Sequence, residues 1–548
     1  MKGLGLNTDA VKSPLRYASQ KWSGEKMLII PSLIEETIDR NLVVTKFSEM
    51  ETSKFGMIAL VPSTKYCKQY QLSGANIATS KNIFNELDTL KKGNFSKLVV
   101  INNRYDGIDL PDESCRILIL DGLPYFDSLT DRYEVQACPQ SELINKRIAQ
   151  KIEQGIGRGV RGEKDYCAVL IIGSELIRFM QSIATNKFFS AQTRKQIEIG
   201  LELTDLAKAD CNKYDFPLDV VVSLINQMLE RDEGWKEYYI STMDSIEDDY
   251  SEGLIYKRLL KEYQFERLFS DGEYEKAQSK MQDLINESTI NDAEKGWYLQ
   301  QLARYTYPTS IEKSNQIQKS AFKLNSQLLK PRTGIIYSQV SYINENRLNN
   351  IRKYLLKYPN YEELALAMKV ILDNLSFGIE AKKFESALKE IGDLLGYISQ
   401  RPDNEIGKGP DNLWCGVNNH YLLFECKSQV SENRSSISKT EAGQMNNHCA
   451  WFDNQYGTTV RIDRFMIIPT KQLSFEGDFS HKVRIIRKNK LRNLKNNIKN
   501  FIEELRPYNL NEILDETIQK LLDLYHLNVE EFYEKYSEEY YHQKKPIE

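Results

Sequence analysis

Four short apolar runs in the first part of the chain constrain its fold most strongly. They are MLII before Pro31, MIALV before Pro62, LVVI before Asn102 and ILIL before Asp121. Each run is apolar throughout and ends at a turn-forming or polar residue, which is typical of strands buried on both faces of a parallel sheet. The N-terminal part of the chain is therefore expected to be an α/β unit with helices on both sides of the sheet.

A short motif follows the last of these runs. Residues 154–161 read QGIGRGVR and fit the pattern Gln-x-x-Gly-Arg-x-x-Arg. It resembles motif VI of superfamily 2 helicases, and the upstream loop NNRYDGIDLPDE resembles motif V. The resemblance implies the second RecA-like lobe of a DEAD/DEAH-type helicase, in which two arginines stabilise charge on the γ-phosphate of ATP. The implied nucleotide-binding residues are Gly107, Asp109, Gln154, Arg158 and Arg161. The alternative is an ordinary basic helix after an ordinary Asp-Gly turn.

The phosphate-binding half of such a motor is not found in the sequence. No Gly-x-x-x-x-Gly-Lys-[Ser/Thr] loop and no Asp-Glu-x-[Asp/His] box occurs in residues 1–548. Without those amides and carboxylates the arginines have no nucleotide to act on. We therefore expect ATP to bind only at an interface with a separate polypeptide that carries the first helicase lobe. A degenerate lobe used as a scaffold, or a chain shortened from a longer gene, are the alternatives.

A second candidate site lies near residue 420. The apolar run YLLF leads into Glu425, Cys426 and Lys427, and strand alternation sends Glu425 and Lys427 to one face. Asp411 follows the turn residues of the segment GKGP and can meet this strand across a hairpin. Two carboxylates would then face one site beside an ammonium group. This donor set suits Mg²⁺ and the hydrolysis of a phosphodiester.

The order of these residues resembles the PD-(D/E)XK nuclease superfamily, through Pro410-Asp411 and Glu425-Cys426-Lys427. In that family the helix before the turn often contributes a carboxylate, for which Glu385 in FESALKEIGDLLGY is the first candidate and Glu390 the second. The helix after the catalytic strand corresponds to KTEAGQMNNHCAWF, with Gln444 as its active-site residue. The resemblance implies Asp411 and Glu425 as metal ligands. The alternative is surface chemistry that matches a short pattern by chance.

Composition bounds the remaining possibilities. A chain of 548 residues is longer than one hydrophobic core usually spans. A net charge of −4 gives no overall basic field that would attract nucleic acid. The eight cysteines lack zinc-binding spacing, which favours reduced thiols. We expect a cytoplasmic protein, because no signal-peptide core and no membrane-spanning apolar run occurs.

The chain is expected to be multidomain, with α/β and all-α parts. The expected divisions are a RecA-like parallel α/β lobe at 1–180, an all-helical connector at 181–380 that contains one tetratricopeptide-like hairpin, a mixed α/β restriction-endonuclease-like domain at 381–506, and a helical tail at 507–548. The segment KVRIIRKNKL is expected to be a further strand of the nuclease sheet. The basic run is expected to be a phosphate-contacting surface, with a solvated edge strand and helix as the alternative, and consists of Lys482, Arg484, Arg487, Lys488, Lys490, Arg492 and Lys495.

Together these features predict a Mg²⁺-dependent endodeoxyribonuclease coupled to a helicase-like lobe, with DNA as its substrate. Defence against foreign DNA is expected by analogy, because helicase and restriction-type nuclease modules are often combined in such systems. Two alternatives remain open. The first is a non-catalytic adaptor that binds DNA or a partner, favoured by the missing first lobe. The second is a DNA-repair nuclease, which the sequence does not separate from a defence enzyme.

Overall fold

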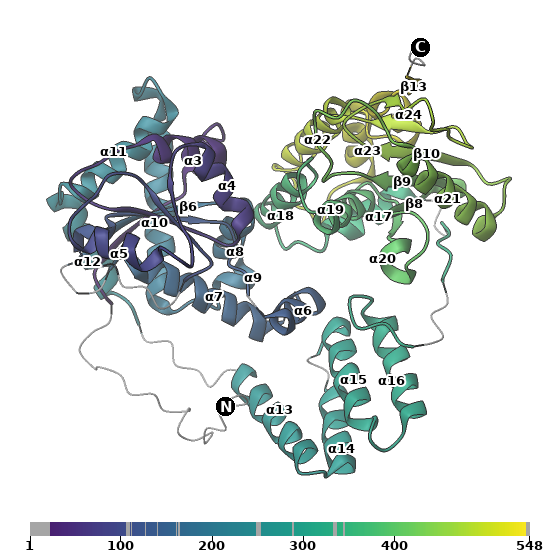
Figure 1. The fold of residues 1–548 in the computed structure, drawn as a ribbon, viewed down its shortest axis with the longest axis horizontal. Helices are drawn as coiled ribbons and strands as arrows, with labels where there is room; N and C mark the ends of the chain where they lie inside the picture. The colour runs from purple at the N-terminus through teal and green to yellow at the C-terminus, as the bar shows by residue number, and fades with distance from the viewer. Residues whose placement is uncertain are drawn as a thin grey trace. The chain divides into compact units, whose positions relative to one another are not determined.

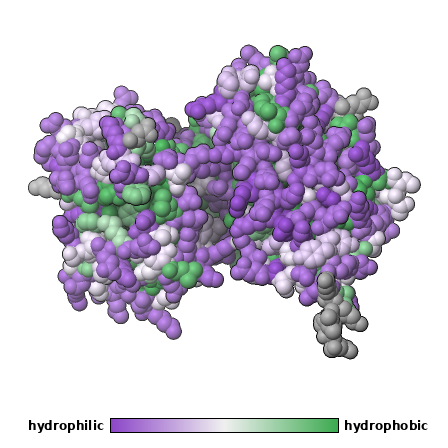
Figure 2. Space-filling view, turned by 90° about the horizontal axis from the view of Figure 1, so that it is seen from above, coloured by the Kyte–Doolittle hydropathy of each residue, from purple (hydrophilic) through white to green (hydrophobic). Residues whose placement is uncertain are grey.

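The chain folds into two compact units, Met1–Arg332 and Thr333–Glu548. The computed structural model describes residues 22–105, 110, 112–126, 128–139, 141–160, 162, 165–247, 254–287, 290–332, 337–342 and 346–543. None of the helices in this described part is long and apolar enough to cross a membrane. The face drawn in Figure 2 is mostly hydrophilic, with apolar side chains gathered in a patch on the left.

The first unit is built on a six-stranded, fully parallel sheet with the order β1-β6-β5-β2-β4-β3 (Figure 1). Its strands are β1 (Glu25–Ile29), β2 (Met57–Val61), β3 (Asn76–Ala78), β4 (Val99–Asn102), β5 (Ile117–Asp121) and β6 (Tyr166–Ile172). Alternate residues enter two different cores, Leu28 and Ile58 on one face and Met27 and Met57 on the other. The four apolar runs are therefore strands buried on both faces, and the prediction of a parallel α/β sheet is confirmed.

Helices cover both faces of this sheet. Helices α5, α7 and α8 contribute to one core, and α3, α4, α11 and α12 to the other. The helices up to α12 are α2 (Pro31–Ile34), α3 (Arg40–Glu49), α4 (Thr64–Leu72), α5 (Ile83–Lys91), α6 (Leu129–Ala137), α7 (Glu142–Ile156), α8 (Ser174–Gln181), α9 (Ile183–Asn186), α10 (Ala191–Asp210), α11 (Pro217–Leu229) and α12 (Glu233–Asp244). Short 3₁₀ turns occur at η1 (Asp112–Cys115), η2 (Gly157–Gly159) and η3 (Cys211–Lys213).

Four further helices complete the first unit. They are α13 (Leu254–Ser270), α14 (Tyr274–Ile285), α15 (Asp292–Thr306) and α16 (Ile311–Leu324). Phe265, Met281 and Tyr298 share a core between α13, α14 and α15, and α15 packs along α16. The segment expected to form a helical hairpin thus forms α14 and α15.

The second unit contains a five-stranded mixed sheet with the order β12-β10-β9-β8-β7. Its strands are β7 (Ile398–Gln400), β8 (Asn412–Gly416), β9 (His420–Cys426), β10 (Ile462–Ile467) and β12 (Arg484–Ile486). The pairs β7-β8 and β8-β9 are antiparallel, whereas β10 runs parallel to both β9 and β12. A separate parallel pair joins β11 (Gln472–Leu473) to β13 (Tyr541–His542), so the C-terminal segment expected to be helical also forms a strand.

Most helices of the second unit share one core with one face of its sheet, and α21 packs on the other face. The helices are α17 (Arg347–Leu355), α18 (Tyr361–Asn374), α19 (Ala381–Leu394), α20 (Pro402–Ile406), α21 (Lys439–Tyr456), α22 (Lys488–Glu503), α23 (Asp515–Leu524) and α24 (Val529–Tyr536), with a 3₁₀ turn at η4 (Val417–Asn419). The mixed sheet and its helices follow the order that the sequence predicted. The domain boundaries at residues 180, 380 and 506 stay predictions.

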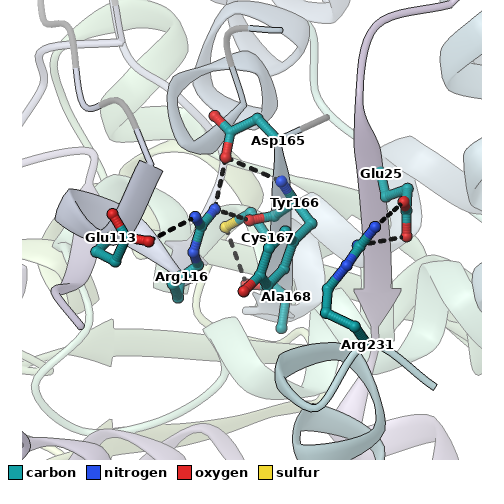
Figure 3. A network of polar contacts seen from close by, with 8 residues as sticks. All are labelled: Glu25, Glu113, Arg116, Asp165, Tyr166, Cys167, Ala168 and Arg231. Atoms are coloured by element: carbon teal, nitrogen blue, oxygen red, sulfur yellow. Dashed lines mark hydrogen bonds and ion pairs between the residues drawn. The ribbon is translucent and has the colours of Figure 1, made fainter. Parts of the chain in front are cut away.

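A charged network closes the N-terminal edge of the parallel sheet (Figure 3). Arg116 immediately precedes β5, is almost fully buried, and donates to Asp165 at 2.5 Å and to the carbonyl oxygen of Tyr166 at 2.8 Å. The guanidinium groups of Arg116 and Arg231 lie over the Tyr166 ring at 3.9 and 4.3 Å from its centroid. Arg231 also forms a bidentate ion pair with Glu25. These pairs join the starts of β1, β5 and β6.

Replacing Arg116 tests how much this network stabilises the first unit. Arg116→Ala leaves the buried Asp165 carboxylate without its guanidinium partner, so we expect the free energy of unfolding to fall by about 3 kcal/mol. Urea unfolding followed by circular dichroism measures the change. Lys208→Ala is the control, because Lys208 and its partner Asp205 are exposed and such pairs contribute less than about 1 kcal/mol. Equal losses of unfolding free energy in the two variants would contradict a stabilising role for the Arg116 network.

Candidate functional site

The hairpin of β8 and β9 brings the predicted acidic residues together. Asn412 pairs with Phe424, which places Asp411 beside the end of β9. An Asp411 carboxylate oxygen accepts a hydrogen bond from the backbone N–H of Cys426 at 2.7 Å. The turn before Asp411 depends on Gly409, whose φ of +97° and 2.9 Å approach of a Cβ to the Trp451 ring both exclude a larger residue. Asp411 therefore lies across the β8–β9 hairpin from the end of the strand that carries Glu425.

Glu425 lies at the centre of the site. Its side chain is buried, Oε1 forms an ion pair with Lys427 Nζ at 2.6 Å, and Oε2 lies 2.8 Å from His448 Nε2, a contact that is an ion pair when the imidazole is protonated. Strand alternation accounts for the contact with Lys427, which is two residues further along the chain. His448 comes from α21 on the neighbouring face. The sequence places His448 one turn after Gln444 and favours a packed or exposed histidine over a ligand, because its contact with Glu425 depends on how α21 packs.

Helix α21 is fixed at its start by a capping box. Ser438 accepts from the backbone N–H of Glu441, and the Glu441 carboxylate accepts from the backbone N–H of Ser438. Arg434 adds a bidentate ion pair to Glu441, with both contacts at 2.6 Å. Gln444 is exposed and lies one helical turn before His448, so both residues occupy the same side of α21. Gln444 thus lies on the side of α21 that contacts Glu425.

Helix α19 places Glu385 at the edge of the site. The helix packs so closely on β8 that a Cβ on Gly392 would lie 2.6 Å from the Trp414 ring. The Asn412 side-chain amide donates to the backbone carbonyl of Glu385 at 3.0 Å, which ties this turn of α19 to the residue after Asp411. The Glu385 carboxylate forms an ion pair with the buried Arg401. The second candidate, Glu390, accepts a hydrogen bond from Tyr354 instead.

Burial, and after it the neighbouring negative charges, determines the electrostatics of the site. Burial raises the pKa of Asp411 well above its ordinary value, and the charges of Glu425 and Glu385 raise it further. Burial also raises the pKa of Glu385, although Arg401 acts in the opposite direction. For Glu425, burial favours the neutral form, but His448 and Lys427 outweigh it and hold the pKa below its ordinary value. The protein thus holds one ionised carboxylate beside one that is costly to ionise.

The donor set fits a divalent cation held by two carboxylates. Among the described residues, no group of three or more His, Cys, Asp or Glu side chains is arranged to hold a metal ion. Asp411 and Glu425 are hard oxygen donors beside each other, and Mg²⁺ is commonly bound through one or two carboxylates and several waters. Burial, and after it the charges of Glu425 and Glu385, raises the pKa of Asp411, and a bound cation would favour its ionised form.

The expected phosphate-contacting surface is largely engaged in internal contacts. Arg484 is buried, Arg487 pairs with Glu538 and Lys488 with Glu432. Lys495 donates to Ser376 at 2.6 Å, and burial lowers its pKa. The segment from Lys482 to Lys495 therefore holds α22 and α24 to the sheet, and only part of its charge faces solvent.

The helicase-like motif of the first unit spans the end of α7 and the turn η2. Gln154 is exposed on α7, and Arg158 in η2 donates from Nε to the backbone carbonyl of Tyr105 at 2.8 Å. This contact joins the QGIGRGVR segment to the loop after β4. Three of the predicted nucleotide-binding residues, Gly107, Asp109 and Arg161, lie outside the described residues. Lys151, for which the motifs predict no role, donates to Asn103 at 3.0 Å and to the Tyr125 carbonyl.

Comparison with known families identifies one part of the chain. Residues 44–193 match the family model of the helicase C-terminal domain. The match runs from within α3 to the start of α10 and includes Gln154 and Arg158. No curated protein matches the chain. The first unit therefore contains a helicase-like C-terminal lobe, in agreement with the motifs.

Neutralising Asp411 should stabilise the protein when no metal is added. Because the folded-state pKa of Asp411 is raised, its ionisation destabilises the fold above the unfolded pKa of about 3.9, and increasingly so until the folded pKa is passed. Asp411→Asn keeps an acceptor for Cys426 and removes the charge. We expect a rise of about 2–4 °C in the melting temperature of the second unit at pH 8, and a smaller rise at pH 5.

The measurement is scanning calorimetry with a chelator present at both pH values. Glu476→Gln is the control, because Glu476 is exposed and belongs to the same unit. It should leave the melting temperature within about 1 °C. A lower melting temperature for Asp411→Asn at pH 8 would show that Asp411 is a structural rather than a functional carboxylate.

Proposed function

We propose that the second unit is a Mg²⁺-dependent endodeoxyribonuclease coupled to the helicase-like lobe of the first unit. The observation that carries this proposal is the meeting of Asp411, Glu425 and Lys427 at the adjoining ends of β8 and β9. Helicase C-terminal domains belong to enzymes of nucleic-acid metabolism, which favours DNA as the substrate. A role in defence against foreign DNA follows by analogy with combined helicase and nuclease systems.

Each residue of the site would have a distinct role in phosphodiester hydrolysis. Asp411 and Glu425 would hold Mg²⁺, which supplies Lewis-acid stabilisation of charge on the phosphate. Lys427, now 2.6 Å from Glu425, would orient the attacking water and offset charge that develops on the phosphate oxygens. Glu385 and Gln444 would support the metal or the substrate from α19 and α21. His448 would keep the Glu425 carboxylate in its orientation.

The first unit would contribute to an ATP site shared with another polypeptide. Gln154 and Arg158 lie at the end of α7, within the residues that match the helicase C-terminal domain. Together with Arg161, Gly107 and Asp109 they would face a nucleotide that the partner's first lobe binds. ATP-dependent movement would then deliver DNA to the nuclease unit.

One observation favours the non-catalytic adaptor as the second candidate. Both oxygens of Glu425 are already paired with cationic or imidazole groups, so metal binding has to compete with Lys427 and His448. A unit that only binds DNA or protein needs no such exchange. The cleavage experiment below separates these two functions.

Cleavage by the purified chain tests the nuclease. With Mg²⁺, we expect nicking or linearisation of plasmid DNA, and a decrease of about 100-fold or more in the Lys427→Ala variant, because the water loses its positioning ammonium. The assay includes linear DNA, and is repeated with ATP and a polypeptide that carries the first helicase lobe. Lys520→Ala is the control, an exposed lysine on α23 of the same unit, and should retain full activity. Absence of cleavage under every condition would contradict the nuclease and favour the non-catalytic adaptor.

ATP hydrolysis tests the shared motor. The purified chain alone should show only background turnover, whereas a partner that carries a phosphate-binding loop should give DNA-stimulated turnover. Arg158→Ala should reduce that turnover by about 1,000-fold if Arg158 contacts the γ-phosphate. Arg267→Ala, an exposed arginine on α13, is the control. Strong DNA-stimulated turnover without a partner would contradict the shared site.

A further inference from the structure

Arg401 is a buried arginine at the candidate nuclease site to which the proposed mechanism gives no role. It lies between β7 and α20, is 8% exposed, and forms an ion pair with Glu385 on α19. Burial of a guanidinium group is costly unless its charge is paired, and replacing a buried ion pair by apolar side chains is often neutral or stabilising. The pair is therefore a candidate for a role beyond stability.

The start of α20 is attached to the turn that precedes Asp411. The backbone N–H of Asp403 donates to the carbonyl oxygen of Pro410 at 3.2 Å. A Cβ on Gly409 would lie 3.0 Å from the Cβ of Pro402, so the two segments pack without space between them. A displacement at the start of α20 would therefore move the turn that holds Asp411.

The other side of Asp411 is attached to α19. The side-chain amide of Asn412 donates to the backbone carbonyl of Glu385 at 3.0 Å, and Arg401 binds the carboxylate of the same residue. The contacts of α19, α20 and the Asp411 turn therefore form a closed ring. Within this ring, Arg401 fixes the position of the Glu385 carboxylate relative to Asp411.

The three carboxylates of the site lie within electrostatic range of one another. Burial, and after it the charges of Glu425 and Glu385, raises the pKa of Asp411. Burial also raises the pKa of Glu385, the charge of Glu425 acts in the same direction, and Arg401 acts in the opposite one. Glu385 is therefore close enough to both proposed metal ligands to affect a cation between them.

The burial of Arg401 favours an action through Glu385 over direct contact with DNA. The Arg401 side chain is 9% exposed, against 19% for Lys427, the other cationic side chain of the site. Its Nε is fully buried and has no hydrogen-bond partner among the described residues. A phosphate that enters from solvent would therefore meet Lys427 first.

We propose that Arg401 is a positioning residue of the nuclease, which holds the Glu385 carboxylate ready to accept hydrogen bonds from waters on a divalent cation at Asp411 and Glu425. The inference rests on the proposed function, because it requires a metal at that site. Mg²⁺ keeps several waters when it is bound by one or two carboxylates, and groups behind the ligands tune its affinity. A carboxylate has about four lone-pair sites, so contact with Arg401 leaves acceptors for water.

The test is binding of Mn²⁺ to the full chain without DNA, measured by the loss of the electron paramagnetic resonance signal of the free ion. Mn²⁺ is the probe because it takes the same oxygen donors as Mg²⁺. We expect Arg401→Gln to raise the Mn²⁺ dissociation constant by about tenfold. The loss of a positive charge alone would act in the opposite direction, because a cation near the carboxylates repels Mn²⁺. Weaker binding therefore reports the position of Glu385.

Further variants separate positioning from folding. Arg401→Lys should restore most of the affinity, because one nitrogen makes the contact with Glu385 and an ammonium can replace it. The double variant Glu385→Gln with Arg401→Gln leaves no unpaired buried charge, and should bind Mn²⁺ as Glu385→Gln alone does. Arg506→Gln is the control, an exposed arginine after α22, and should bind within about twofold of the unaltered chain.

Unchanged or tighter Mn²⁺ binding in Arg401→Gln would overturn the proposal, as would weaker binding in the double variant than in Glu385→Gln. If Arg401→Gln does not fold, the double variant and Arg401→Lys decide by the same criteria. Asp411→Asn separates this proposal from the proposed function. Loss of binding in Asp411→Asn with unchanged binding in Arg401→Gln would overturn the role of Arg401 alone, whereas unchanged binding in Asp411→Asn would overturn both.

Discussion

The register of the β8–β9 hairpin determines the candidate nuclease site. Pairing of Asn412 with Phe424 places Asp411 next to the backbone N–H of Cys426, and leaves Glu425 on the side that α21 covers. Because side chains alternate along a strand, a shift of one residue would send Glu425 to the opposite face. The turn with Gly409, held under the Trp451 ring, fixes that register from the side of β8. The remaining contacts of the site are built around this arrangement.

The main chain of this site follows from the sequence, but its charge pairing does not. Apolar periodicity indicates β9 and α19, and alternation indicates that Glu425 and Lys427 share a side. The pairs of Glu425 with His448 and of Glu385 with Arg401 join different elements, so they depend on helix packing that no local pattern records. In the first unit, likewise, the strands were predictable, whereas the Arg116 network joins strand starts that are distant in sequence.

The segment KVRIIRKNKL shows why a local pattern can mislead. Only Arg484–Ile486 forms a strand, and α22 begins at Lys488. Lys488, Leu491, Leu494 and Ile498 continue a helical period, and Leu491, Leu494 and Ile498 enter the core. The basic residues around this junction neutralise acids of the C-terminal segment, such as Glu538, which accepts from Arg487 and Lys471. Their density in the sequence thus reflects internal pairing as well as any contact with nucleic acid.

Buried acidic side chains are neutralised to different extents in the two charged regions of the protein. At the edge of the parallel sheet, each buried acid is matched by a guanidinium group, so charge is neutralised and the strands are joined. Around Asp411 the matching is incomplete, because Lys427 and His448 both pair with Glu425 and the pKa of Asp411 stays raised. Unneutralised buried charge costs stability and is retained where it has a use. This asymmetry supports the proposal that Asp411 acts in catalysis, whereas the paired Arg116 stabilises the fold.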